Sequence, residues 1–215
     1  MASVLQHLKP WFATLSGSVL EVGCGEQPYR DLIPESCSYG GLEWEGSQQY
    51  FAYGNEDTTY YDGDVFPFQG ESFDNVFHTE VLEHVYNTEG FLRECFRVLK
   101  PGGIMLFSVP FQARYHYIPM DFWRFTPAAL ERKLLEAGFA DIQIKPRGND
   151  ITVAAYKMVS VFYRWLSGGV KQKLLGLAVG PIALFFLVAG HISLNIEIGS
   201  SDDCLGYTVT ARKRA

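Results

Sequence analysis

The chain has 215 residues, carries a formal net charge of −6 and is 47% hydrophobic. This length fits one domain, or one domain with an insertion, and the apolar fraction is sufficient to bury a sizeable core. The negative charge argues against duplex nucleic acid as a substrate, because proteins that hold phosphate backbones rely on a basic surface.

The four cysteines form no Cys-x-x-Cys pair, so the sequence predicts no zinc site, and no other metal site is expected. Residues 1–20 contain no basic stretch followed by an apolar run, so no secretory signal is expected. Together these features predict reduced thiols and a cytoplasmic location.

The N-terminal part of the chain predicts one helix and several short strands. Residues 3–15 indicate a lead-in helix that is interrupted near Pro10. Short apolar runs then predict strands at Ser18–Val22, Tyr39–Trp44 and Phe73–His78.

The middle of the chain predicts a helix, a breaker and a strand. In residues 88–99 apolar side chains recur at three- and four-residue steps, which gives a helix one apolar face. The sequence Lys-Pro-Gly-Gly at 100–103 is expected to act as a breaker before a strand at Ile104–Val109.

The C-terminal part predicts one more helix of this kind and two more strands. Thr126 can cap a helix over residues 126–138, and Gly138 can end it. Residues 140–145 and 206–212 alternate in the manner of strands. Strands that alternate with helices predict an α/β fold with a mostly parallel sheet and helices on both faces.

Residues 147–203 break this alternation and are predicted to form an apolar helical insertion before the last strand. No charged residue occurs over 174–196 if histidine is neutral, whereas 151–167 carries Lys157 and Arg164. Glycines and a proline are expected to divide the longer run into shorter helical pieces.

Two interpretations of the insertion stay open. It is a soluble lid that buries its apolar side on its own domain or on a second copy, or it contacts a membrane peripherally through 151–196. In the second case Lys171, Lys173 and the basic segment 212–214 would meet anionic headgroups. A single crossing is not expected, because the strands on either side must join one sheet in one compartment. The sequence predicts no particular oligomeric state.

The first predicted strand runs into a turn that contains Gly23 and Gly25. Glycines allow a tight turn and a close approach of the backbone to a ligand without a Cβ clash. Open α/β sheets bind ligands beyond the carboxyl ends of their strands, where this turn is placed. A glycine turn also occurs in proteins that bind nothing there, so the turn alone leaves both interpretations open.

Two carboxylates after the next strands favour an adenosine as the ligand. Glu43 closes the second strand about twenty residues after the turn, where it can accept both ribose hydroxyls. Asp64, in the segment Tyr61–Asp64 that follows the third strand of the sheet and precedes Phe73–His78, can accept the adenine amino group. A nicotinamide dinucleotide is disfavoured, because Pro28 replaces the third glycine of its fingerprint and Glu21 and Glu26 would repel a pyrophosphate.

Four segments occur in order along the chain: Val19–Gly25, Ser72–Val76, Glu80–Val85 and Arg97–Gly103. They resemble the successive motifs of class I S-adenosylmethionine-dependent methyltransferases of the ubiquinone/menaquinone-type and type 11 group. The resemblance covers about residues 16–146 and resumes at 204–213. It implies a Rossmann-like seven-stranded sheet with an antiparallel last strand and a helical insertion before that strand.

The resemblance also implies S-adenosylmethionine as the cofactor. The residues implied to bind it are Glu21, Gly23 and Gly25 for the methionine half, Glu43 for the ribose, Asp64 for the adenine, and Thr79 and Glu80 beside the methyl-bearing end. Gln27 departs from the family pattern, which often has another glycine there, and this leaves the path of the loop open.

Residues 110–126 resemble the H-x-x-P-x-D-F-W-R-F-T segment of bacterial methyltransferases associated with surface-glycan or lipid-linked pathways. Because the segment leaves the carboxyl end of a strand, it is expected to overlie the methyl group. His116 is the predicted general base for an oxygen nucleophile, since an imidazole titrates near neutral pH. Tyr115, Asp121 and Arg124 are predicted to bind the acceptor, although Asp121 and Arg124 can equally form a structural ion pair.

The leading hypothesis is in-line methyl transfer to an unidentified small-molecule, glycan or lipid-linked acceptor. One alternative is an enzyme of the same fold that uses the cofactor for another reaction. A second is a membrane-associated binding or scaffold protein with a vestigial cofactor site. The carboxylates Glu21, Glu43 and Asp64 count against a vestigial site.

Overall fold

The computed structural model describes residues 2–50, 57–196 and 198–214. The chain divides into two compact units. One, which we call the sheet unit, comprises Met1–Pro110, Arg114–Lys145 and Tyr207–Ala215. The other, which we call the hairpin unit, comprises Phe111–Ala113 and Pro146–Gly206.

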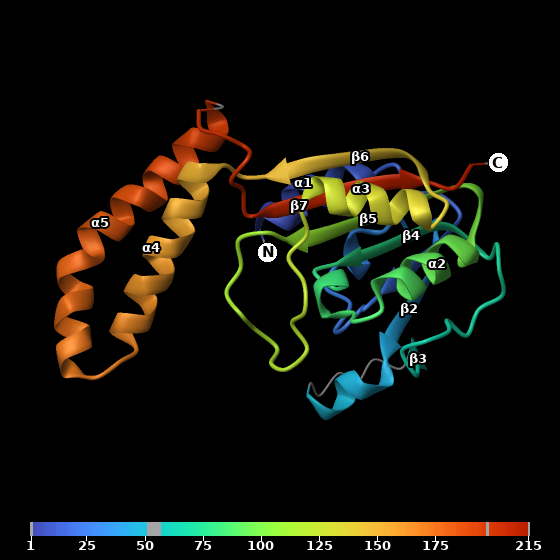
Figure 1. The fold of residues 1–215 in the computed structure, drawn as a ribbon, viewed down its shortest axis with the longest axis horizontal. Helices are drawn as coiled ribbons and strands as arrows, with labels where there is room; N and C mark the ends of the chain where they lie inside the picture. Colours follow the sequence, from blue (N-terminus) through green and yellow to red (C-terminus); the bar gives the residue numbers. More distant parts are fainter. Residues whose placement is uncertain (1, 51–56, 197, 215) are drawn as a thin grey trace. The chain divides into compact units, whose positions relative to one another are not determined.

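A seven-stranded sheet organises the sheet unit (Figure 1). Its strands are β1 (Ser18–Val22), β2 (Ser38–Trp44), β3 (Thr58–Tyr61), β4 (Phe73–Thr79), β5 (Leu99–Pro110), β6 (Ala140–Arg147) and β7 (Gly206–Arg212). They lie in the order β3-β2-β1-β4-β5-β7-β6, and the pairs from β3 to β5 are parallel. From β1 the chain adds β2 and β3 on one side, and it then places β4 on the other side of β1. The carboxyl ends of β1 and β4 therefore form the switch point where such sheets bind ligands.

The last strand, β7, runs antiparallel to β5. Near the end of β7, Lys213 N–H donates to the carbonyl of Gly103 at 3.0 Å, and Gly102 N–H donates to the carbonyl of Lys213 at 2.8 Å. At the other end, Phe111 N–H donates to the carbonyl of Leu205 at 2.9 Å. The predicted fold class is confirmed, including the antiparallel last strand and the helical insertion before it.

Helices cover both faces of this sheet. They are α1 (Ala2–Phe12), α2 (Thr88–Val98) and α3 (Pro127–Glu136). From α1, the ring of Phe12 meets Phe77 of β4 at 5.2 Å between centroids, and from α2 Phe91 meets His78 at the same separation. Consecutive strand residues point to opposite faces, so α1 and α2 cover opposite faces, and α3 lies on the face of α2 (Figure 1).

The predicted start and end of α3 are confirmed. Thr126 Oγ1 accepts the N–H of Ala129 at 3.3 Å, and Pro127 occupies the first turn, where its missing N–H is not needed. Gly138 follows the helix with a φ of +102°, a conformation that favours glycine.

Two predictions about Pro and Gly in the sheet unit are wrong. Helix α1 passes through Pro10 and ends at Phe12, because Leu8 and Phe12 anchor both sides of the proline in the core. The segment 100–103 does not delay the start of the strand, because its backbone pairs with the end of β7. Strand β5 therefore begins at Leu99. The irregularity is absorbed instead as a shift of register between β4 and β5.

The hairpin unit contains two helices, α4 (Asp150–Leu166) and α5 (Val170–Asn195). Asn149 begins α4 with a capping box, in which its side chain accepts the N–H of Thr152. The same side chain accepts a hydrogen bond from Ser193 Oγ at 3.2 Å and donates to the carbonyl of Ile198 at 2.9 Å. The two ends of the hairpin are therefore tied together at one residue.

Helix α5 is unbroken over 26 residues, so the prediction of shorter pieces is wrong. Its glycines serve close packing rather than breaks: a Cβ on Gly190 would lie 3.0 Å from Ala155 Cβ, and one on Gly180 would lie 3.3 Å from Phe162. Packing against α4 thus compensates the low helix propensity of glycine, and it retains the helix through Pro181.

Candidate functional site

The glycine turn follows β1 at the switch point. Gly23 and Gly25 have φ values of +67° and +50°, and Gln27 also has a positive φ of 55°. The N–H groups of Gly23 and Cys24 donate to the carbonyl of Leu42 on β2 at 2.8 and 3.2 Å. A Cβ on Gly23 would lie 2.5 Å from Val81 Cγ2, so only glycine allows the turn to approach the end of β4 this closely.

Glu43, at the end of β2, binds the turn directly. Its carboxylate accepts the N–H of Gly25 at 2.8 Å and that of Trp44 at 3.0 Å. Burial raises the pKa of Glu43, and these two hydrogen bonds oppose that rise. The structure therefore brings Glu43 and Gly25 together, as their predicted roles require, and the role of Glu43 at a ribose stays a prediction.

Glu21 lies inside the same region on β1. It is 2% exposed, and Tyr39 O–H donates to its carboxylate at 2.5 Å. Burial raises the pKa of Glu21 to about 8, the hydrogen bond from Tyr39 opposes this rise, and the charge of Glu43 adds to it. Burial raises the pKa of both carboxyl groups, and a cationic ligand would stabilise their ionised forms.

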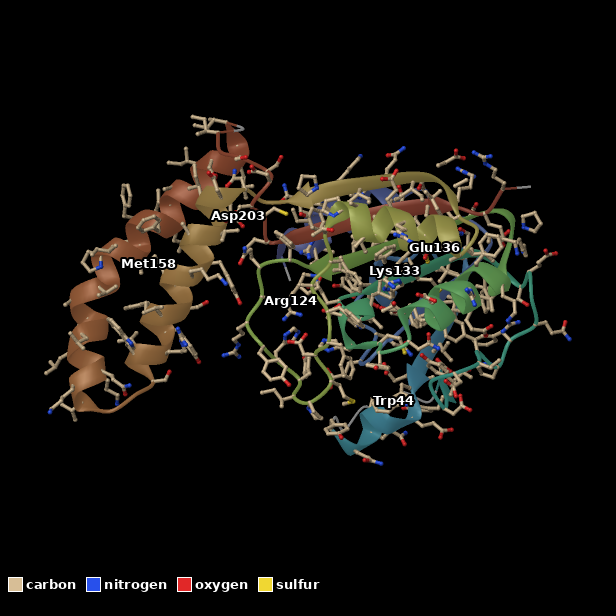
Figure 2. All side chains as sticks on the ribbon, in the orientation of Figure 1. Trp44, Arg124, Lys133, Glu136, Met158 and Asp203 are labelled. Carbon is tan, nitrogen blue, oxygen red and sulfur yellow. The ribbon has the colours of Figure 1, made fainter. Side chains whose placement is uncertain are left out.

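A hollow of about 500 Å³ lies beside Glu43, at the end of β2. It is lined by Trp44, Glu45, Gly46, Gln48, Gln49 and Asp62. Trp44, labelled in Figure 2, donates its indole N–H to the carbonyl of Asp62 at 3.2 Å. An indole next to a candidate ribose carboxylate offers a stacking surface for a base.

The hollow does not test the predicted adenine contact, and the role of Asp64 stays a prediction. Asp64 is exposed and is not part of its lining, whereas Asp62 is, and Asp64 N–H donates to Asp62 Oδ1 at 3.0 Å. Sequence reasoning missed Trp44 and Asp62. The signal for Trp44 was available, since an aromatic residue directly follows the carboxylate at the strand end.

Thr79 ends β4 on the other side of the switch point, and Glu80 follows it directly. Glu80 has a φ of +53°, which is unfavourable for a residue with a side chain. Two contacts with Ser108 hold it there: Glu80 N–H donates to the carbonyl of Ser108 at 2.9 Å, and Ser108 Oγ donates to the Glu80 carboxylate at 2.8 Å. Strain of this kind is retained where surrounding structure enforces it, often at functional sites.

The segment 114–124 is docked on the 3₁₀ helix η3 (Leu82–His84), which follows β4. The N–H groups of Phe122 and Trp123 donate to the carbonyl of Glu83 at 2.9 and 3.2 Å. The indole N–H of Trp123 donates to the carbonyl of Val85 at 3.0 Å. The predicted acceptor segment is therefore positioned at the carboxyl end of β4 by backbone contacts.

Asp121 and Arg124 form an ion pair that organises this segment (Arg124 is labelled in Figure 2). Arg124 donates to both carboxylate oxygens of Asp121, at 2.6 and 2.8 Å, and His116 N–H donates to the same carboxylate at 2.9 Å. Burial alone would raise the pKa of Asp121, but these donors hold it at about 2. The geometry favours the structural role, and contact of Tyr115, Asp121 or Arg124 with an acceptor stays a prediction.

His116 lies next to His84 and Glu83 of η3, and the sequence did not predict this grouping. Its ring meets the ring of His84 edge-on, with 4.9 Å between centroids. Glu83 is fully buried, and its carboxylate lies 3.7 Å from His84 Nε2. Burial raises the pKa of Glu83 well above its usual range, and the charge of Glu80 adds to this effect.

The fold is similar to the Rossmann-like fold of solved methyltransferases. An S-adenosylmethionine-dependent methyltransferase from Archaeoglobus fulgidus is similar, with a TM-score of 0.61 at 17% sequence identity, over 98% of this chain and 92% of that chain. At such low identity the likeness concerns the fold.

Sequence relatives point to the same class of enzyme. A family model described as "Methyltransferase domain" matches residues 20–107. A Mycolicibacterium smegmatis protein described as a probable S-adenosylmethionine-dependent methyltransferase is 35% identical over 96 residues, covering 43% of this chain and 37% of that relative. A ubiquinone biosynthesis O-methyltransferase of Pseudomonas fluorescens is 27% identical over 128 residues, covering 60% of this chain and 50% of that relative.

Residues 20–107 match the methyltransferase-domain model, and the relatives support the class I S-adenosylmethionine-dependent methyltransferases of the type 11 group, as the motifs predicted. S-adenosylmethionine is the cofactor of this family, which confirms the expected cofactor. The chain spans half or less of the length of the two relatives named above.

Proposed function

We propose that the chain binds S-adenosylmethionine at the carboxyl ends of β1 and β2 and methylates a hydroxyl oxygen of a glycan or lipid-linked acceptor. The observation that carries the proposal is the buried Glu43, which accepts the N–H of Gly25 beside the hollow at Trp44. A glycine turn, a carboxylate and an aromatic face together match the phosphate-free, cationic nucleoside that this family uses.

The reaction places modest demands on the protein. When bound, S-adenosylmethionine supplies an electrophilic methyl group, whose bond to sulfur breaks with its electron pair as a bond to the acceptor oxygen forms and the acceptor loses a proton. The chain contributes alignment and exclusion of water. In this proposal Glu21 and Glu43 hold the cationic end and the ribose, and His116 is the group predicted to receive the proton.

A hydroxyl acceptor is supported by the relatives and by the loop. The Pseudomonas fluorescens relative is named as an O-methyltransferase of ubiquinone biosynthesis. The loop 114–124 presents the exposed Tyr115 close to His116 at the end of β4. The runner-up, a scaffold protein with a vestigial site, would have no reason to keep Glu21 and Glu43 buried next to the turn.

Isothermal titration with S-adenosylmethionine, S-adenosylhomocysteine and NAD is the first test. The proposal expects the first two to bind and NAD to bind more weakly. Transfer of a labelled methyl group to lysate fractions from cells that lack this protein would then identify the acceptor. Tighter binding of NAD than of S-adenosylmethionine would remove the proposed cofactor.

The hairpin unit supports a peripheral membrane location for the acceptor. Within the described residues, one helix is long and apolar enough to cross a bilayer: Val170–Asn195, with a mean hydropathy of 2.1 over its most apolar window and 17% of that window buried. Its small residues, such as Gly176 and Gly190, pack against α4, and large apolar residues such as Phe185 are exposed. A helix that is apolar all round is typical of burial in protein or lipid.

A single crossing conflicts with the sheet, because β6 and β7 on either side of the hairpin are neighbours in it. Lys157 and Arg164 make α4 costly to place at the centre of a bilayer, at about 2.5–3.5 kcal/mol each. We therefore propose that the hairpin lies in one leaflet, with Lys171 and Lys173 near anionic headgroups, and that the protein is cytoplasmic.

Flotation with vesicles that contain anionic lipid tests the hairpin separately. Phe185→Asp is expected to reduce the floating fraction, because Phe185 is 67% exposed in α5. Val65→Asp is the matched control, since Val65 is 63% exposed in the sheet unit. Wild-type protein that is monodisperse without detergent and does not float would exclude the membrane location.

A further inference from the structure

Three side chains with metal-binding atoms converge beyond the end of β4. Glu83 and His84 come from η3, and His116 comes from the docked segment 114–124. One ligand atom from each of the three residues lies within 4.8 Å of the others. Glu83 and His84 lie in one sequence motif and His116 in another, 32 positions after His84, so the sequence alone does not indicate this grouping.

Glu83 is the unusual member of this group. Its side chain is 0% exposed, and neither carboxylate oxygen has a hydrogen-bond partner among the described residues. His84 Nε2 is likewise buried and without a hydrogen-bond partner there. A buried carboxylate and a buried ring nitrogen are rarely left unsatisfied in a folded protein, so this pair requires a further partner.

The second ring nitrogen of each histidine is already held. His84 Nδ1 lies 2.5 Å from the carbonyl of Met120, and His116 Nδ1 lies 2.9 Å from the carbonyl of Arg114 and 3.0 Å from Asp121 Oδ2. An N–H at Nδ1 that donates to these oxygens leaves the lone pair on Nε2. Histidines that bind metals are commonly oriented in this way by a carbonyl or a carboxylate.

The positive charge nearest to the group is neutralised. Arg124 Nη2 lies 3.4 Å from His116 Nδ1, but the guanidinium is paired through both Nη atoms with Asp121. Glu80, at the end of β4, adds negative charge, since it acts electrostatically on Glu83. The local charge therefore favours a cation.

We propose that Glu83, His84 and His116 bind one divalent first-row transition-metal ion, such as Mn²⁺ or Zn²⁺. Two imidazoles and one carboxylate form a donor set typical of such ions, and three protein ligands leave coordination positions open. This assignment departs from the sequence-based expectation of no metal site, which rested on cysteine spacing.

The open position gives the ion a role that rests on the proposed methyl transfer. A hydroxyl bound to the ion loses its proton more readily, so the proton passes to solvent and the oxygen attacks the methyl carbon as an alkoxide. His116 would then act as a ligand in place of a general base. The site that binds the ion and the turn that binds the cofactor remain separate groups of residues.

Manganese binding to the full-length, chelator-treated protein tests the proposal directly, by loss of the electron paramagnetic resonance signal of free Mn²⁺. One ion per chain is expected, and Zn²⁺ should compete for it. Glu83→Gln, His84→Ala and His116→Ala are each expected to weaken binding by at least roughly 10–100-fold, the loss seen even for residues that only support a ligand. His191→Ala, an exposed histidine of α5, is the matched control.

His116→Ala guards against misfolding, because His116 lies in a loop with 25% of its side chain exposed. Titration with S-adenosylmethionine in chelator separates the two proposals: cofactor binding without the ion is expected, and its failure alone would reject the proposed function. Wild-type protein that takes up neither Mn²⁺ nor Zn²⁺, or uptake unchanged in all three variants, would reject the metal site.

Discussion

Two carboxylates at the same edge of the sheet have opposite surroundings. Glu43 accepts two backbone N–H groups, from Gly25 and Trp44, so its charge is supported by the fold itself. Glu83 is more deeply buried, and its oxygens have no such donor among the described residues. The first is preorganised for a ligand that exchanges hydrogen bonds with it, whereas the second requires a partner that brings positive charge.

The difference also separates the two halves of the proposed reaction. Glu43 and the glycine turn belong to β1 and β2, where the family binds its cofactor. Glu83 belongs to the end of β4, together with the loop that carries His116. Variants on the two sides should therefore affect different measurements, and variants of the structural contacts should affect stability alone.

The largest effect is expected from His116→Ala on turnover, a fall of roughly 10²–10⁴-fold, as for loss of a general base or of an ion that replaces it. Affinity for S-adenosylmethionine should not change, because the ring contact and hydrogen bonds of His116 are with η3 and with its own loop. The measurement is methyl transfer to the acceptor-containing lysate fraction, with calorimetry of the cofactor in parallel. Loss of cofactor binding in this variant would contradict the separation of the two sides.

Gly23→Ala should be the most destabilising change at the cofactor side. The added Cβ would lie 2.5 Å from Val81 Cγ2, at a φ of +67°. Overpacking and the left-handed backbone together predict a loss of about 2–4 kcal/mol in the free energy of unfolding.

Gly102→Ala is the control for Gly23→Ala, and urea denaturation measures the stability of both variants. The difference between the two losses is the steric part. The φ of Gly102 is also positive, at +81°, but no described heavy atom other than its chain neighbours lies within 4 Å of the added Cβ. It should lose only about 1–2 kcal/mol. Equal losses in the two variants would show that the approach of the turn to Val81 is not tight.

Asp121→Asn tests whether the ion pair is structural. Asp121 has 1% of its side chain exposed and Arg124 has 25%, so the loss should be about 2–3 kcal/mol, below that of a fully buried pair. The exposed pair of Arg132 with Glu136 on α3 is the control (Glu136 is labelled in Figure 2). Arg132→Ala should change stability by less than about 0.5 kcal/mol in the same denaturation.

Glu43→Ala should weaken S-adenosylmethionine binding by about 1–3 kcal/mol, the cost of hydrogen bonds to a charged group. Mn²⁺ uptake should be unaffected by Glu43→Ala. Glu83→Gln should do the reverse: it should weaken Mn²⁺ binding and leave cofactor affinity unchanged. Unchanged cofactor affinity in titration calorimetry would remove Glu43 from the site.

The smallest effect concerns pH and Glu21. Its pKa in the folded protein is raised from 4.5 to about 8, so the protonated form contributes stability that is complete below pH 4.5 and is lost as the pH rises through about 8. A cationic ligand favours the ionised form, so binding below pH 8 should release a proton from Glu21. Calorimetry at pH 7 in buffers of different ionisation enthalpy measures this release.

Glu21→Gln supplies the reference for that measurement, because the ligand's own titration is the same in both proteins. The wild type should release more protons than the variant. Identical release would mean that Glu21 does not face the bound cation.

Local patterns in the sequence were sufficient for six of the seven strands, apart from the start of β5, and for the helices of the sheet unit and the glycine turn. The apolar run at Ser18–Val22 and the helical spacing of Phe91, Leu92 and Cys95 are local patterns, which neighbouring residues decide. The motif order identified the family and its cofactor for the same reason, since each motif is contiguous in the chain.

Tertiary structure alone decided the features that depend on distant partners. The segment 100–103 became strand because Lys213 pairs with it, and α5 stayed unbroken because its glycines pack against α4. Glu83, His84 and His116 met only when the loop docked on η3. Such contacts produce no periodic pattern in the sequence, because they are stabilised by packing and hydrogen bonds between residues far apart in the chain.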